Sequence, residues 1–152
     1  MAKFFYRMQN ILDIKYKLEE QAKQEFMTVQ HRLNEAQEQL AHLESRKNTY
    51  MQQYVRLVSS KLEVLEIEEC KNAIILMDEY IHNQQQVVRR IERELDLAAQ
   101  KMNLAIQERK IHEKLKEKQF DEFLQELNQE EMKEIDQLIS YQYNNKDDAQ
   151  EV

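Results

Sequence analysis

The sequence predicts an all-α protein, a long antiparallel two-helix coiled-coil hairpin with a short helical tip. Its 152 residues include no glycine and no proline, although a chain of this length usually holds about 18 of them. Tight turns and helix C-caps depend on those residues. Apolar residues also recur every three or four positions along most of the chain, which is the spacing of a coiled-coil seam.

Composition and charge narrow the class of function. The net charge of −7 argues against nucleic acid as a partner, because phosphate binding needs clustered Lys and Arg. The longest apolar run, residues 73–77, is far shorter than the ~20 residues of a membrane span, and the N-terminus has no signal-peptide apolar region. The single cysteine, Cys70, excludes an intrachain disulfide and suits a reducing compartment. We therefore expect a cytoplasmic protein.

The first helix is expected over about residues 3–57. From Ile11 through Ile14, Leu18 and Ala22 to Phe26 the apolar steps are 3, 4, 4 and 4, which predicts a stutter that locally relaxes the supercoil. Beyond it the seam steps alternately by three and four and consists of Phe26, Val29, Leu33, Ala36, Leu40, Leu43, Lys47, Tyr50, Tyr54 and Leu57.

A short tip is expected over about residues 58–72. Ser60-Lys61-Leu62-Glu63 has the pattern of a capping box, in which a Ser hydroxyl and a Glu carboxylate satisfy amides of a helix start. Asn72 is also a good cap, so Cys70-Lys71-Asn72 predicts a second bend. A separate short helix should lie between these two points.

The second helix is expected over about residues 73–140, which completes a hairpin over 1–143, and residues 144–152 are polar and predict a flexible tail. If residue numbers across the seam sum to 131, Leu40 faces Ile91 and large residues meet small ones; a shift by seven residues also fits. The seam of this helix steps again by three and four and consists of Ile74, Met77, Ile81, Gln84, Val88, Ile91, Leu95, Ala98, Met102 and Ala105.

No catalytic, cofactor or metal site is expected. His112-Glu113-Lys114-Leu115-Lys116 begins like the zinc-protease motif, but Lys116 stands where the second His ligand must be. Without glycine no backbone loop can cradle a phosphate. The charge run Lys114–Lys118 is interpreted as a solvated helix face. Two aromatic clusters remain as candidate contact surfaces, one at residues 4–12 and one made of Tyr50, Tyr54, Met77 and Tyr80.

Several segments resemble the FliJ family. Residues 5–13 are similar to its opening, an aromatic followed by a Leu-Gln-x-Leu-Leu-Asp type run, and residues 36–40 resemble its first helix. Residues 77–81 resemble the start of its second helix, and residues 105–118 resemble its A-x-x-E-x-K and E-K-L-x-E-K motifs. Glu131, Lys133, Glu134, Ile135 and Asp136 match its closing pattern. The similarity spans about residues 3–140 in the expected order.

This resemblance implies a non-enzymatic component of flagellar type III export, similar in fold to the stalk subunit of rotary ATPases. The implied partners are the hexameric export ATPase, whose assembly and activity it promotes, the cytoplasmic domain of the export gate, and export chaperones. The chain would be a cytoplasmic monomer, peripherally associated with the membrane-bound apparatus. Carried over by position, the gate-facing patch consists of Gln39, Leu43, Tyr50, Met77, Tyr80 and Gln84.

Two departures and two alternatives stand beside this expectation. Arg46 and Ala73 occupy positions where relatives can carry aromatics, which makes the patch less aromatic. One alternative is the stalk protein of a virulence type III secretion system. The other is a generic coiled-coil scaffold, which would dimerise through its seam, whereas a hairpin is a monomer.

Overall fold

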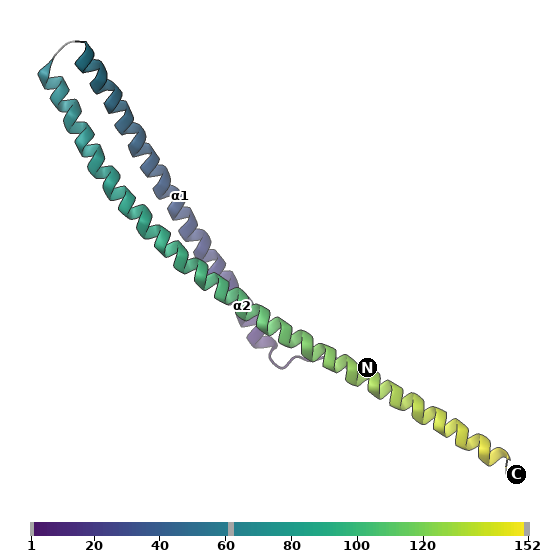
Figure 1. Cartoon of the computed structure of the whole chain (residues 1–152). Coiled ribbons are helices and arrows are strands. Elements are labelled where there is room, and N and C mark those ends of the chain that lie inside the picture. The colour runs from purple at the N-terminus through teal and green to yellow at the C-terminus, as the bar shows by residue number, and fades with distance from the viewer. Residues whose placement is uncertain (1, 61–62, 151–152) are drawn as a thin grey trace. The chain divides into compact units, whose positions relative to one another are not determined.

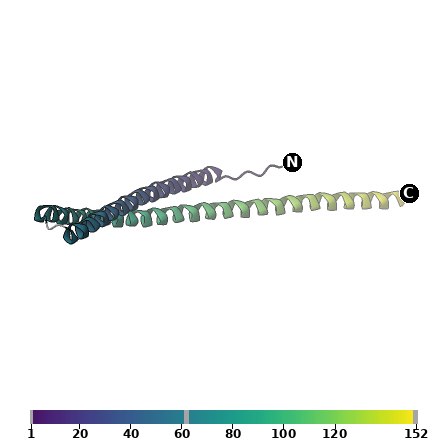
Figure 2. The same ribbon diagram turned by 90° about the horizontal axis from the view of Figure 1, so that it is seen from above.

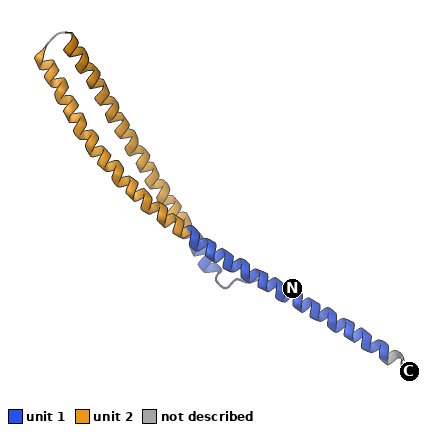
Figure 3. Cartoon of the chain, viewed as in Figure 1, with its two compact units in different colours: residues 1–17, 106–152 blue, residues 18–105 orange. Residues whose placement is uncertain are grey.

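The computed structural model describes residues 2–60 and 63–150, apart from the side chains of 148–150. Within these ranges the chain forms two helices and no strand, α1 (Gln9–Ser59) and α2 (Val64–Gln150). The two helices run antiparallel (Figure 1 and Figure 2), so the predicted helical hairpin is confirmed. The chain divides into unit 1, residues 1–17 and 106–152, and unit 2, residues 18–105 (Figure 3).

The core of unit 2 is a narrow apolar seam between the two helices. Leu33 and Ala36 of α1 pack with Val88 and Ile91 of α2, and all four are buried. Burying a Leu, Ile or Val side chain stabilises a fold by about 1.5–3 kcal/mol. The 20 residues that the heptad spacing predicts as the seam are all buried or half-buried: Phe26, Val29, Leu33, Ala36, Leu40, Leu43, Lys47, Tyr50, Tyr54, Leu57, Ile74, Met77, Ile81, Gln84, Val88, Ile91, Leu95, Ala98, Met102 and Ala105.

The register across this seam differs from the expected one by one heptad. Ion pairs join Arg32 to Glu94 at 2.8 Å and Glu25 to Lys101 at 2.9 Å, and each pair of numbers sums to 126. These residues flank the seam, where such pairs sum to two more than the facing seam residues. Facing seam residues, such as Ala36 and Val88, therefore sum to 124, seven less than expected. Gln84 donates from Nε2 to the Ala36 carbonyl at 3.0 Å. The expected pairing of Leu40 with Ile91 is therefore wrong, and Leu40 lies near Gln84.

Charge explains why the observed register is preferred. Both registers match apolar residues with apolar residues at most seam positions, so burial alone does not separate them. A shift of the observed pairing by seven would place Arg32 beside Lys101, whereas the observed register gives both cations carboxylate partners. Like charges on facing helix edges are unfavourable, and opposite charges set the register of a coiled coil.

The predicted stutter near the start of α1 is also wrong. Leu12 and Ala22 are buried, and the seam keeps its heptad phase through Lys15 and Glu19. Lys15 bonds to Glu108 at 2.8 Å, and Glu19, which is buried, pairs with Lys23 at 3.0 Å. These ion pairs offset the cost of placing charged side chains at seam positions. The residues expected there are exposed instead: Ile11, Ile14 and Leu18.

The predicted separate tip helix is not formed. Ser59 and Ser60 donate their hydroxyls back to the carbonyls of Val55 and Arg56, at 2.7 and 2.9 Å, so they belong to the end of α1. α2 begins at Val64 and continues without a break through residues 70–72. Buried Cys70 lies four residues before seam residue Ile74, so packing extends the helix through the expected bend. Residues 61 and 62 of the predicted capping box lie outside the described residues.

Both outer ends of the helices differ from expectation. α1 begins at Gln9 rather than near residue 3. The Phe4 ring lies 5.2 Å from that of Phe120, edge-on, while Phe5 is exposed and Tyr6 is buried. This alternation belongs to an extended segment. α2 continues past the predicted end near 140 to Gln150, so the polar segment from 144 is helical that far.

Cysteine crosslinking tests the register. In a Cys70→Ser background, cysteines at 40 and 84 should form an intramolecular disulfide, because Gln84 bonds to Ala36 and Gln39 in the turn next to Leu40. Cysteines at 40 and 91, in the same background, serve as the control and should stay reduced, since disulfides need close Cα atoms. Mobility on a non-reducing gel reads out both variants. Crosslinking of the control pair instead would show that the register is the shifted one.

Candidate functional site

The predicted gate-facing patch lies in unit 2, along one edge of the α1–α2 pair. The ion pair Arg32–Glu94 marks this edge. Gln39 follows Arg32 by seven residues, and Tyr80 precedes Glu94 by fourteen, so both share the edge in a heptad repeat. We call it the Gln39 edge. Arg46 and Ala73, the two departures from an aromatic patch, fall on the same edge by the same spacing.

Three of the six patch residues come together around one groove. Gln84 donates from Nε2 to Oε1 of Gln39 at 3.2 Å. Both glutamines and Leu43 line a groove of about 610 Å³, together with Glu35, Glu38 and His42. The groove therefore offers an amide pair beside an apolar side chain, which suits a partner segment that makes both hydrogen bonds and apolar contacts.

The remaining patch residues differ in what a partner could reach. Tyr80 is 46% exposed, so its ring is available. Tyr50 is half-buried and lines a second hollow with Ala73, while its carbonyl accepts from the Cys70 thiol at 3.2 Å. Met77 is only 4% exposed. It packs in the seam, so its side chain is not available to a partner.

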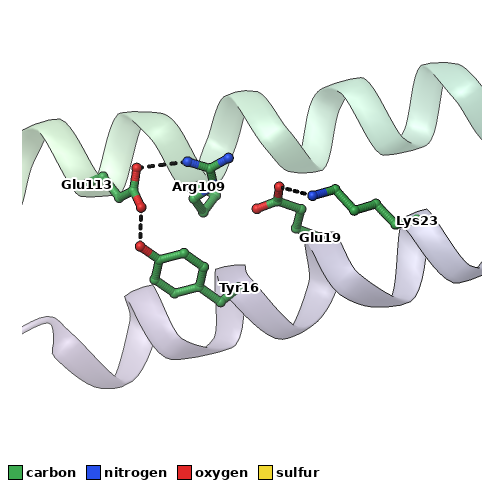
Figure 4. A network of polar contacts seen from close by, with 5 residues as sticks. All are labelled: Tyr16, Glu19, Lys23, Arg109 and Glu113. Atoms are coloured by element: carbon green, nitrogen blue, oxygen red, sulfur yellow. Dashed lines mark hydrogen bonds and ion pairs between the residues drawn. The ribbon is translucent and has the colours of Figure 1, made fainter.

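In unit 1, polar contacts join the start of α1 to α2 (Figure 4). The Tyr16 hydroxyl donates to Oε1 of Glu113, and Arg109 donates from Nη1 to Oε2 of the same carboxylate at 2.8 Å. The Arg109 guanidinium lies 6.0 Å from the Tyr16 ring centroid, within reach of a cation–π contact. The Glu19–Lys23 pair in the same view belongs to unit 2.

A second ion pair in unit 1 perturbs a carboxylate. Lys15 Nζ lies 2.8 Å from Glu108 Oε2. The pKa of Glu108 is lowered, first by this hydrogen bond and then by the charge of Lys15, with a smaller lowering from His112. Burial acts in the opposite direction and is weaker. The ion pair therefore favours the ionised form of Glu108 in the folded chain.

The end of α2 presents a surface that the sequence reasoning missed. All described side chains from 128 to 147 are exposed, and they include an apolar stripe made of Met132, Ile135, Leu138 and Ile139. The sequence contained a signal for this unpaired helix end, because the second periodic segment is longer than the first and cannot be covered by it along its whole length. The observed helices have 87 and 51 residues, so the end of α2 has no counterpart in α1.

Among the described residues, no group of three or more His, Cys, Asp and Glu side chains could hold a metal ion. In the described part of the chain, neither helix has a stretch that is long and apolar enough to cross a membrane.

Comparison with known proteins decides the family. Residues 4–148 match the family described as Flagellar FliJ protein. The chain belongs to the FliJ family. Neither the curated proteins nor the solved structures contain a match. The resemblance in the sequence is thus confirmed, and this FliJ-family chain is a component of flagellar protein export.

The Lys15–Glu108 pair predicts a pH-dependent contribution to the stability of this FliJ-family chain. Because the pKa of Glu108 is lowered on folding, the pair stabilises the chain above the unfolded-state pKa, and this gain is lost as pH falls through the folded-state pKa. Glu108→Gln should lower the free energy of unfolding at pH 7 and leave it unchanged at a pH below both values. Urea unfolding followed by circular dichroism measures this.

Glu122→Gln is the matched control, because Glu122 lies on the same helix and forms no ion pair with the described residues. Its effect on the free energy of unfolding should be the same at both pH values. An equal loss for Glu108→Gln at both pH values would contradict the ion-pair explanation.

Proposed function

We propose that this chain is a non-enzymatic export component that binds the hexameric flagellar export ATPase, promotes its assembly and activity, and couples it to the export gate. The observation that carries this proposal is the family match over residues 4–148. A helical hairpin with exposed contact surfaces, rather than a pocket of converging catalytic groups, suits such a role.

The ATPase contact is proposed for unit 1. Its surface offers exposed Phe5 and Met8 in the N-terminal segment and the apolar stripe of α2 around Ile135 and Leu138. An apolar helix face that no part of the described chain covers is the kind of surface that buries area against a partner. In this proposal the stripe enters the ATPase ring and stabilises its hexameric form.

The gate contact is proposed for the Gln39 edge of unit 2. Gln39, Leu43 and Gln84 share one groove, and Tyr80 presents its ring on the same edge. Because the ATPase and the gate would use different units, one chain could bind both. Escort of export chaperones is part of the same proposal, as is a position peripheral to the membrane-bound apparatus in the cytoplasm.

A single hairpin is proposed as the working form. The seam of α1 is filled by α2 of the same chain, as the Leu33–Ala36–Val88–Ile91 cluster shows. A generic scaffold would need that seam for a second chain, so the packing speaks against it. The flagellar family match likewise disfavours a stalk protein of a virulence secretion system.

The test is ATP hydrolysis by the cognate export ATPase with and without this chain, alongside electron microscopy of ring formation. The proposal expects faster hydrolysis and more hexameric rings when the chain is present. Unchanged hydrolysis, together with separate elution of the two proteins in gel filtration, would refute the ATPase role.

Tyr80→Ala tests the gate contact. Loss of an interface tyrosine typically costs a factor of about ten or more in affinity, and Tyr80 is outside the buried seam, so helicity should not change. Affinity for the cytoplasmic domain of the gate is measured by calorimetry, and helicity by circular dichroism. Tyr143→Ala, which removes an exposed tyrosine of unit 1, should bind like the parent. Normal gate affinity and normal export with Tyr80→Ala would count against the patch.

A further inference from the structure

Unit 1 carries an uncovered apolar surface to which both helices contribute. Ile11 lies four residues before Lys15, and Ile111 lies three residues after Glu108. Residues three or four apart are neighbours on a helix, and Lys15 and Glu108 are joined at 2.8 Å. The apolar side chains beside this ion pair therefore share the edge where the helices meet. We call this surface the isoleucine patch; it consists of Ile11, Ile14, Ile111 and Leu115, which are 37–64% exposed.

The rim of the isoleucine patch is basic. Lys114 and Lys118 lie three residues after Ile111 and Leu115, and Arg7 stands just before the start of α1. Lys17 follows Ile14 by three residues. None of these four cations forms an ion pair with the described residues. A partner that covers the patch should thus bring an apolar stripe with carboxylates on both sides of it.

The end of α2 has this chemistry. Its exposed apolar residues, Met132, Ile135, Leu138 and Ile139, recur at spacings of three and four and are 54–69% exposed. Asp136 neighbours Met132 and Ile139, Glu134 neighbours Leu138 on the other side of the stripe, and Glu131 lies between Ile135 and Leu138 in angular position around the helix. Over residues 121–136 seven acidic residues stand against Lys133 alone. We call the apolar residues Met132, Ile135, Leu138 and Ile139, together with the acidic residues beside them, the acidic stripe.

The acidic stripe cannot cover the isoleucine patch of its own chain. Leu115 and Ile135 lie in one continuous helix, α2, and at 1.5 Å per residue their 20-residue separation is about 30 Å. The geometry points to a second copy of this chain as the occupant, with the acidic stripe of each copy on the isoleucine patch of the other. This reciprocal arrangement uses the same two surfaces on both copies, as a closed two-fold dimer does.

This interface is separate from the α1–α2 seam, so each hairpin still folds by itself. Self-association through this interface goes beyond the proposed function and does not require it. The dimer contact and the proposed ATPase contact nevertheless overlap, because the acidic stripe is part of the surface proposed for the ATPase. A second copy would cover that surface in the free chain, and binding of the ATPase would displace it, leaving the single hairpin as the working form.

Analytical ultracentrifugation of the full chain tests self-association. Over roughly 1 to 200 μM, a range suited to a small and partly polar interface, the chain should pass from monomer to dimer at low salt. High salt should weaken the dimer by about tenfold, because exposed charges are screened. Monomers at every concentration in low salt would overturn the inference.

A charge swap then identifies the surfaces. Lys114→Glu with Lys118→Glu makes the rim acidic, and Glu131→Lys with Glu134→Lys makes the stripe basic. Each double variant alone should be monomeric, since like charges then face each other in both contacts. An equimolar mixture should dimerise, because in the mixed pair both contacts again join opposite charges. Monomers in the mixture would overturn the inference.

Arg89→Glu with Arg90→Glu is the matched control, since it makes the same charge change on exposed residues of unit 2. It should dimerise like the parent chain, and loss of its dimer would overturn the assignment to unit 1. Ile11→Ser with Ile111→Ser should abolish the dimer while far-ultraviolet circular dichroism stays unchanged, because both residues are exposed. A parent chain that stays monomeric but stimulates the ATPase would refute this inference alone; a parent chain that dimerises but gives no stimulation would refute the proposed function alone.

Discussion

The apolar seam between α1 and α2 is the constraint on which the rest of the structure depends. Without glycine or proline the chain has few local signals other than helix propensity, and an isolated helix with one apolar stripe is only marginally stable in water. Packing Leu33 and Ala36 against Val88 and Ile91 removes that stripe from water. The register of the helices, the groove beside Gln39 and the exposed surface at the end of α2 depend on where this seam begins, which residues it pairs and where it ends.

Polar residues within and beside the seam decide the pairing. Apolar residues at heptad positions are nearly interchangeable, so they permit several registers. Gln84, which bonds to the Ala36 carbonyl and to Gln39, and ion pairs such as Arg32–Glu94 are specific to one of them. The same bond draws Gln39 and Gln84 together in the groove of the proposed gate contact. Register and site are thus consequences of the same polar contacts.

The unequal lengths of the helices produce the other candidate surfaces. α2 has 36 residues more than α1, 87 against 51, so its end keeps an apolar stripe with no helix from α1 against it. A protein that works alone gains nothing from such a surface, whereas a protein that enters a larger assembly buries it there. The Gln39 edge of unit 2, proposed for the gate, and the terminal surfaces of unit 1, proposed for the ATPase, fit the proposal of a chain that connects two partners.

The sequence by itself determined the helical hairpin, the family and the 20 seam positions from Phe26 to Ala105, because heptad spacing is a local property of the chain. Tertiary structure decided the rest. The seven-residue choice of register, and the seam through Lys15 and Glu19 in place of Ile14 and Leu18, depend on which residues face each other across the helices. Spacing along one helix carries no information about its partner, so these features emerge only when both helices are in place.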